Sequence, residues 1–194
     1  MNKDRVTGLD KQLAVIASLP YHLSRLPLRE GLSLALDALL KVTKSEAAEL
    51  FLRESVTGDL FLAAHRGPFR NAFFQLTRFR PGEGYPGIIA VKKEPIFTTQ
   101  LQTDPRYLRT RVKDLGFRSY LCVPIESGDE MLGSLNLASR ELRRDYPEYK
   151  RLLSWAAPSI AMAVRLRLYE VEKLFETSLA RITVETERNL DSML

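Results

Sequence analysis

The segment FRSYLCVPIES, residues 117–127, constrains the fold most, because it is apolar on both sides of an extended chain. Side chains of a strand alternate between its two faces. Both alternating sets are mainly apolar here: Tyr120, Cys122 and Pro124 form one, and Leu121, Val123 and Ile125 the other. A strand covered on both faces lies inside a sheet. We therefore expect this strand to be central, with helices as one cover and a ligand pocket as the other.

Two antiparallel hairpins are predicted around this strand. EAAELFLRES (residues 46–55) and DLFLAAHRG (residues 59–67) have an apolar period of two, and Gly58 and Asp59 between them suit a turn. The second hairpin joins residues 117–127 to MLGSLNLASR (residues 131–140) through GDE. A short strand is also expected at EPIFTT, residues 94–99.

Helical periodicity appears at both ends of the chain and between the strands. One helix is expected to end at Pro20, and another covers about residues 29–44. A short helix is expected near residues 85–92. DPRYLRTRVKDLG predicts a helix over residues 105–115, because Asp104 is a favourable N-cap, Pro105 suits the first helical position and Gly116 lies past the end.

A long helix is predicted from about Pro147 onward. Its apolar residues step by three or four: Leu153, Ala157, Ile160, Val164, Leu168, Val171, Phe175, Leu179 and Ile182. This heptad-like seam is longer than the domain needs, which favours a dimerising coiled helix over one lying only on its own domain. Pro158 is expected to kink the helix or to mark a restart.

The spacing G-x-G-x-x-G occurs at Gly82, Gly84 and Gly87. A dinucleotide-binding loop with this spacing follows the first strand of a parallel unit and opens a helix. Here the glycines follow an antiparallel hairpin, and Pro86 lies inside the motif. We therefore interpret Gly82 and Gly84 as turn glycines.

Composition excludes several classes of function. The 29 Lys and Arg residues against 24 Asp and Glu give a net charge of +5, but acidic residues are interspersed and no DNA-binding motif is present, so we expect no nucleic-acid partner. No apolar run reaches the ~20 residues of a membrane span, and the N-terminus lacks the apolar core of a secretory signal. Cys122 is the only cysteine, so an internal disulfide cannot form. A cytoplasmic location is expected.

The order of these segments resembles that of GAF domains. SEAAELFLRES, GDLFLAAHRG, PGEG with a third glycine, EPIFTT, DPRY, GFRSYLCVPIES and LGSLNLAS follow one another at the family's spacing. The most specific parts are residues 81–84, 116–119 and 133–135, together with Pro124. Residues 28–170 would form the GAF domain, residues 1–27 an N-terminal helix beside it, and residues 171–194 a C-terminal signalling helix leading to an absent output domain.

The resemblance implies an α+β, PAS-related fold. A central six-stranded antiparallel sheet would carry the N- and C-terminal helices on one face and a loop-covered pocket on the other. The implied function is a regulatory, signal-sensing domain that binds a small-molecule effector and acts through its C-terminal helix on an output domain, such as a histidine kinase of a two-component system. The implied assembly is a homodimer through the terminal helices.

The chain departs from several ligand-binding GAF subfamilies. It has no NKFDE pattern, which argues against cyclic nucleotides, and no cysteine between residues 100 and 118, which argues against a covalent bilin. His65 has no ligand partner nearby in sequence, so neither haem nor another metal site is expected. Methionine-sulfoxide-reducing relatives use at least two cysteines, whereas this chain has one. The ligand, if there is one, stays unidentified.

Candidate pocket residues follow from the two faces of the sheet and from the resemblance: Phe79, Phe97, Tyr107, Arg111, Tyr120 and Cys122. No catalytic set stands out, so we expect no enzymatic activity. Cys122, between apolar neighbours, is interpreted as a core residue that could line the pocket rather than as a reactive thiol.

Arg111 is the predicted anion-binding residue. In a helix over residues 105–115 it lies at the edge of the apolar stripe of Leu108, Val112 and Leu115. Arg106, Arg109 and Lys113 would face solvent. Arg111 could instead form an ion pair with Asp104 or Glu83.

The alternative to a ligand-binding domain is a ligand-free dimerisation scaffold. In that case the pocket is filled by side chains such as Phe73, Phe74, Phe79 and Phe97.

Overall fold

The computed structural model describes residues 3–143 and 146–191. Its centre is one six-stranded sheet in the order β3-β2-β1-β6-β5-β4, and all its pairings are antiparallel. The strands are β1 (Ala47–Arg53), β2 (Leu60–Arg66), β3 (Arg78–Phe79), β4 (Ile96–Thr98), β5 (Ser119–Ser127) and β6 (Glu130–Ser139). The predicted α+β fold with a six-stranded antiparallel sheet is confirmed, and β5 lies inside the sheet as its two apolar faces require.

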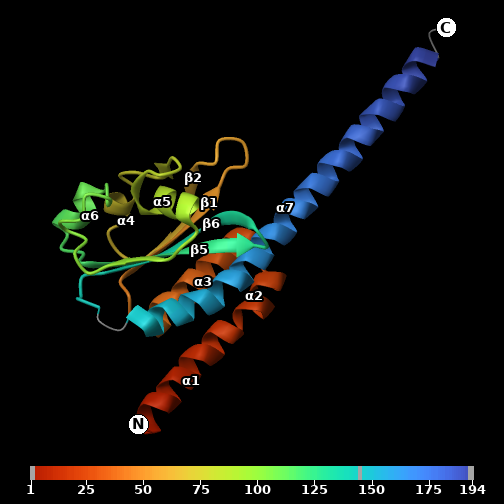
Figure 1. Ribbon diagram of the computed structural model, residues 1–194. Helices are drawn as coiled ribbons and strands as arrows, with labels where there is room; N and C mark the ends of the chain where they lie inside the picture. Colours follow the sequence, from red (N-terminus) through yellow and green to blue (C-terminus); the bar gives the residue numbers. More distant parts are fainter. Residues whose placement is uncertain (1–2, 144–145, 192–194) are drawn as a thin grey trace.

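Four helices cover one face of the sheet. They are α1 (Lys3–Ala17), α2 (Leu19–Arg25), α3 (Leu28–Thr43) and α7 (Tyr146–Asp191). Helices α3 and α7 contact the strands directly, and α1 and α2 form a rod outside them (Figure 1). The short helices α4 (Arg70–Phe73), α5 (Gly84–Lys92) and α6 (Thr110–Asp114) lie with long loops on the opposite face.

Each face of the sheet has its own hydrophobic core. On the helical side, buried aliphatic residues of the strands, such as Leu50 and Val123, pack against Leu36 of α3 and against Leu153 and Ile160 of α7. The loop-side core is largely aromatic, and its rings belong to Phe51, Phe73, Phe79, Tyr85, Tyr107, Phe117 and Tyr120. Alternation along β5 sends Leu121 and Val123 to the first core and Tyr120 and Cys122 to the second.

Two prolines lie within the helical layer. Helix α1 ends at Ala17, and Pro20 occupies the first turn of α2, where no backbone N–H is needed. Helix α7 does not restart at Pro158, because it is continuous from Tyr146 to Asp191. Because Pro158 has no backbone N–H, the carbonyl of Ser154 has no helical donor. Both residues are on the exposed side of α7, where water can bond to that carbonyl.

The predicted seam of α7 divides into two parts. Leu153, Ala157, Ile160 and Val164 are buried against the domain, whereas Leu168, Val171 and Phe175 are exposed as the helix projects beyond the sheet (Figure 1). The side chains of Leu179 and Ile182 and residues 192–194 lie outside the described part. The domain alone therefore accounts for only the first half of the seam.

The three glycines of the G-x-G-x-x-G spacing serve the local turn. Gly82 and Gly84 have positive φ angles of 86° and 60°, which confirms their interpretation as turn glycines. Gly87 is needed for a different reason: an added Cβ would lie 2.0 Å from the carbonyl oxygen of Arg80. The Gly82 N–H donates to the Gly87 carbonyl at 2.8 Å and closes the turn.

Replacing Gly87 with alanine tests this close approach. We expect Gly87→Ala to lower the free energy of unfolding by about 3 kcal/mol, because a backbone carbonyl must move to admit the methyl group. Gly128→Ala is the control: Gly128 has φ of 60° but open space around its Cβ position, so it should lose only about 1 kcal/mol. Urea unfolding of both variants measures the difference, and equal losses would contradict the steric argument.

Candidate functional site

A row of polar and titratable residues crosses the loop side of the sheet. The strand register places His65 of β2 opposite Glu49 of β1, Glu49 opposite Asn136 of β6, and Asn136 opposite Cys122 of β5. Directly paired residues of antiparallel strands share one face. Glu49, Asn136 and Cys122 are almost completely buried, so the loop-side core contains a polar centre within its aromatic shell.

Glu49 is the centre of a buried hydrogen-bonded cluster. Arg109 Nη1 lies 2.6 Å from Glu49 Oε1, and the Tyr120 hydroxyl donates to Glu49 Oε2 at 3.0 Å. Arg109 Nε also donates to the Leu76 carbonyl at 2.8 Å. Glu49 and Arg109 are each 1% exposed. This ion pair therefore ties the centre of the sheet to two of the loops that cover it.

Aromatic rings surround the Arg109 guanidinium. Its Cζ lies 5.4 Å from the centroids of the Phe51 and Phe79 rings and 5.8 Å from that of Phe73. These distances are within the range of cation–π attraction, which strengthens where water is absent. The arginine is thus held from several sides, and its position in the core is well determined.

The segment before α6 positions Arg109, and here the sequence prediction was wrong. Residues 105–109 form a turn and an extended stretch, and the helix covers only Thr110–Asp114. The Asp104 Oδ1 atom accepts the N–H of Arg106 at 2.9 Å, so Asp104 stabilises that turn rather than capping a helix. Helical phase therefore does not apply to residues 105–109, and Arg109, expected on the solvated side, points inward.

A second ion pair, between Arg106 and Asp104, holds the same segment at the edge of the loop-side core. Arg106 donates from Nε to Asp104 Oδ1 at 2.9 Å and from Nη2 to Oδ2 at 2.6 Å, and the Tyr85 hydroxyl also bonds to Asp104. The hydrogen bonds from Arg106 hold the pKa of the Asp104 carboxyl well below its usual range. Asp104 is thus ionised at neutral pH and holds Tyr85, Arg106 and the loop together.

The buried side-chain amide of Asn136, beside Glu49, has no hydrogen-bond partner among the described residues. The other buried polar groups nearby are paired: the Tyr107 hydroxyl with Arg109 and the Ser134 hydroxyl with the Cys122 thiol. Most buried polar groups in folded proteins are hydrogen-bonded, and leaving one unsatisfied costs about 1–3 kcal/mol. The position of the Asn136 amide beside the ion pair makes this the candidate site for polar groups of a ligand or for ordered water.

Burial changes the protonation chemistry of the site. It raises the pKa of the Glu49 carboxyl, although the Arg109 guanidinium and the Tyr120 hydroxyl oppose that rise. For Arg109, burial acts to lower the pKa, but the combined effect of Glu49, Tyr107 and Tyr120 outweighs burial and the pKa is raised. Burial also raises the pKa of the Cys122 thiol. The site therefore holds a guanidinium cation and a neutral thiol at neutral pH.

The structure brings together four of the six predicted pocket residues. Phe79, Tyr107, Tyr120 and Cys122 are buried in the loop-side core. Phe97 packs against the helical-side core instead, because β4 turns that side chain to the other face. Arg111 is exposed, and its backbone N–H donates to Gln75 Oε1 at 3.0 Å. The buried arginine of this segment is Arg109, two residues earlier.

Sequence reasoning missed Glu49, Arg109 and Asn136. A usable signal existed for Glu49, which interrupts the apolar stretch AAELFL, and for Asn136, which interrupts GSLNLA. Charged residues are almost never fully buried without a partner. A buried glutamate therefore implies a buried cation, but no local pattern distinguishes Arg109 from the other arginines of residues 106–111.

A cavity of about 800 Å³ lies elsewhere, between α3 and the outer edge of β2. Over the polar row itself, the aromatic side chains of the loop-side core pack closely, and His65 is the member of the row that also lines this cavity.

Comparison with known proteins identifies the family. A model of the GAF domain family matches residues 26–165, well over half of the chain. The chain belongs to the GAF domain family. No curated protein matches it. The fold expected from the sequence resemblance is thereby confirmed.

Solved structures similar to this GAF domain come from several kinds of protein. The GAF domain of a phosphoenolpyruvate-protein phosphotransferase from Coxiella burnetii superposes with a TM-score of 0.73 at 23% identity, over 84% of this chain and 98% of that one. The GAF domain of A. aeolicus nlh2 in an inactive state gives 0.69 at 19%, over 81% and 97%. The free methionine-R-sulfoxide reductase from Neisseria meningitidis, with its substrate, gives 0.68 at 17%, over 80% and 89%. These likenesses show the fold.

Among the described residues, no group of three or more His, Cys, Asp or Glu side chains is arranged to hold a metal ion. Within the same residues, none of the helices combines the length and the apolar character that crossing a bilayer requires.

The Glu49–Arg109 pair can be tested by breaking it from one side. We expect Arg109→Met to lower the free energy of unfolding at pH 7 by about 3–5 kcal/mol, because it leaves a buried carboxylate without its cation. Glu49→Leu combined with Arg109→Met should lose less than the single variant. Arg167→Met, which breaks an exposed pair with Glu170, should lose under about 1 kcal/mol.

The pH dependence of Arg109→Met provides a second readout of the same variant. Without its cation, Glu49 has a folded-state pKa raised above the ordinary 4.5. A raised carboxyl pKa favours folding below the unfolded-state pKa and loses that contribution as the pH rises through the folded-state pKa. The destabilisation measured by urea unfolding should therefore grow between about pH 4.5 and 7. A loss independent of pH would mean that Glu49 is not a buried carboxylate.

Proposed function

We propose that this GAF domain is a signal-sensing regulatory module. It binds a small-molecule effector on the loop side of the sheet and transmits the change through α7 to an output domain such as a histidine kinase. In this proposal the domain has no enzymatic activity of its own. The raised pKa of the buried Cys122 thiol supports that, because the thiolate and not the thiol is the nucleophile.

The observation that supports effector binding is the unpartnered buried amide of Asn136 beside Glu49. This amide offers donors and an acceptor within an aromatic shell. Ligand sites in proteins are typically apolar with a few fixed polar groups. A compact polar molecule with an aromatic or aliphatic body suits this lining, and its entry requires movement of the covering loops.

The proposed route to the output runs through β5. Tyr120 bonds to Glu49 on the loop side, while its neighbours Leu121 and Val123 pack in the core that contains Leu153 and Ile160 of α7. A ligand that displaces Tyr120 would therefore shift a strand in direct contact with the helix. Coupling of this kind requires that the ligand bind two arrangements of the strand with different affinity.

A specific observation favours the second candidate, a ligand-free dimerisation scaffold. Phe73 and Phe79, two of the aromatic residues predicted to fill the pocket in that case, are buried in the loop-side core. In the scaffold, the Glu49–Arg109 pair would serve only to fix the loops, and Asn136 would remain unsatisfied or bind water.

Asn136→Leu distinguishes the two candidates. If the amide binds an effector, native mass spectrometry of freshly purified wild-type protein should detect a bound small molecule that is absent from the variant. In the scaffold, no such mass is present, and the variant should gain stability of about 1 kcal/mol because a buried unsatisfied amide is replaced by an apolar group. Asn71→Leu, at an exposed amide, is the control and should retain any bound mass.

We also propose that the domain forms a homodimer through its terminal helices. Leu168, Val171 and Phe175 step by three and four along the projecting part of α7 and are 44%, 57% and 69% exposed. Met162 and Leu166 extend the exposed apolar surface toward α2. Apolar surface of this extent rarely stays exposed to water, and the spacing suits a coiled coil.

The double variant Leu168→Glu, Phe175→Glu tests the dimer. Because like charges at seam positions oppose association, it should shift the mass measured by light scattering from dimer to monomer without changing the helical circular dichroism of the domain. Val91→Glu, at an equally exposed apolar residue of α5, should leave the mass unchanged. A dimer that survives the double variant would place the interface elsewhere.

A further inference from the structure

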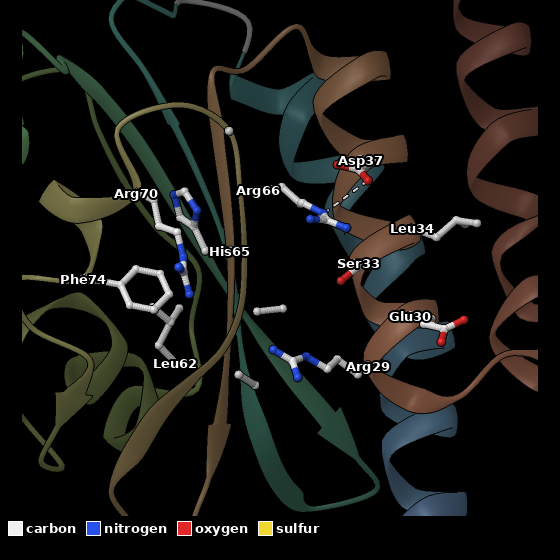
Figure 2. A pocket seen from close by; sticks show the side chains of 13 residues that line it. Arg29, Glu30, Ser33, Leu34, Asp37, Leu62, His65, Arg66, Arg70 and Phe74 are labelled. Carbon is white, nitrogen blue, oxygen red and sulfur yellow. Dashed lines mark ion pairs between the residues drawn. The ribbon is translucent and has the colours of Figure 1, made fainter.

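The outer edge of β2 opens into the cavity of about 800 Å³. The cavity straddles this edge (Figure 2). Ser33 and the other residues of α3 lie on one side of the strand, and Phe74 and Arg70 lie on the other, beyond His65. This cavity is separate from the polar centre at Glu49, and no step of the proposed function uses it.

The backbone of β2 is only partly paired on this side. Strand β3 is two residues long and pairs with Leu60 and Phe61, and the Leu62 N–H donates to the Thr77 carbonyl at 2.8 Å. Beyond that point the chain turns away into α4, and among the described residues no strand pairs with the outer edge of residues 63–66. An unpaired strand edge carries N–H and C=O groups that can bind an added strand.

The charges around the edge are predominantly positive. Arg66 Nε lies 3.2 Å from Asp37 Oδ2, so this arginine has an acidic partner. Within the described part of the chain, neither Arg29 nor Arg70 forms an ion pair. Both point into the cavity, whereas Glu30 turns away from β2 (Figure 2). Two guanidinium groups from opposite sides of the strand are therefore available to an anionic ligand.

The remaining lining is neutral and suits side chains of an extended peptide. Leu62, Ala64 and Phe74 supply apolar contacts. Burial lowers the pKa of His65 to about 4, so this histidine adds no charge at pH 7. The Arg70 guanidinium stacks over the Phe74 ring at 4.2 Å, which holds it at the rim of the cavity.

We infer that this cavity, the β2 edge groove, binds an extended acidic peptide segment of a partner protein. The peptide adds to β2 as an extra strand. Backbone hydrogen bonds to residues 63–66 hold the peptide, and Arg29 and Arg70 bind carboxylates on its two faces. Strand addition of this kind derives affinity from the main chain and specificity from pockets for alternate side chains. Arginine suits the task because its planar fork pairs with carboxylates bidentately.

The same charges exclude a second copy of this edge as the occupant. Two β2 edges brought together would place Arg29 and Arg70 of one chain near those of the other, and like charges across an interface are destabilising. None of the residues that line the groove belongs to α7, on which the proposed homodimer depends. An acidic partner segment is therefore the occupant that the charges favour.

The test uses a seven-residue peptide with three consecutive glutamates between two pairs of valines, blocked at both ends and fluorescently labelled. Consecutive residues of a strand point to opposite faces, so its carboxylates lie on both. We expect it to bind the full chain in fluorescence anisotropy, more weakly at high salt, and to slow hydrogen exchange of the backbone amides in residues 62–67. Three competitors accompany it: the same peptide with lysine for glutamate, the acidic peptide methylated on every backbone nitrogen, and inorganic phosphate. None of the three should reproduce the exchange protection.

Variants of the two free arginines supply the matched comparison. Arg29→Glu with Arg70→Glu should weaken binding of the acidic peptide by about tenfold or more, and it should bring affinity for the lysine peptide up toward that of the acidic one. Arg151→Glu, at an exposed arginine of α7, should leave the affinity unchanged. All three substituted positions are at exposed side chains, so the circular dichroism spectra should match that of the wild type.

Each contrary result overturns the inference in a distinct way. Equal binding of the acidic and lysine peptides would remove the charge selection. Equal binding of the methylated peptide, or equal competition by phosphate, would make the groove a site for small anions rather than for a strand. An acidic peptide that binds without protecting residues 62–67 would bind elsewhere on the surface.

Discussion

The buried ion pair between Glu49 and Arg109 is the interaction on which the loop side of this domain depends. Burying two charges is expensive, and the attraction between them offsets that cost only where the geometry is good and the other polar atoms are bonded. Here Tyr120 and the Leu76 carbonyl supply the additional hydrogen bonds. The pair fixes long loops that have little regular structure of their own to the centre of the sheet, so their folding is coupled to that of the strands.

The two faces of the sheet differ in how they specify structure. The helical side is an aliphatic core, in which α3 and α7 need only present a sufficiently wide apolar stripe. The loop side combines aromatic rings, one ion pair and the unpartnered amide of Asn136. A fully apolar core would hold the same loops at a lower cost in free energy, because no charges would have to be removed from water. The polar groups at this face are the ones on which the proposed effector binding depends.

The sequence was sufficient for the sheet but not for the site. Alternation in residues 46–66 and 117–140 predicted both hairpins, because a one-residue change of register would expose an entire apolar face. It was not sufficient for residues 104–109, where local hydrogen bonds of Asp104 replace the helix that Pro105 and Gly116 suggested. Arg109 then reaches Glu49 across 60 residues of sequence, and no local periodicity contains such a contact. Arg111 was chosen from its helical phase relative to Leu108, but Leu108 lies outside the short helix α6.

The polar row across the sheet physically connects the features that carry the proposals. It begins at His65, which lines the edge groove and contacts the Phe73 ring at 4.9 Å. Phe73 in turn lies against Arg109, whose partner Glu49 also bonds to Tyr120 on β5. A strand added at β2 would alter the surroundings of His65 at one end of this row, and a ligand at Asn136 would act near its middle. In these proposals, both events would reach β5, and through it α7, by contacts between neighbouring side chains. One sheet could therefore integrate two inputs if each favours a different packing of β5 on α7.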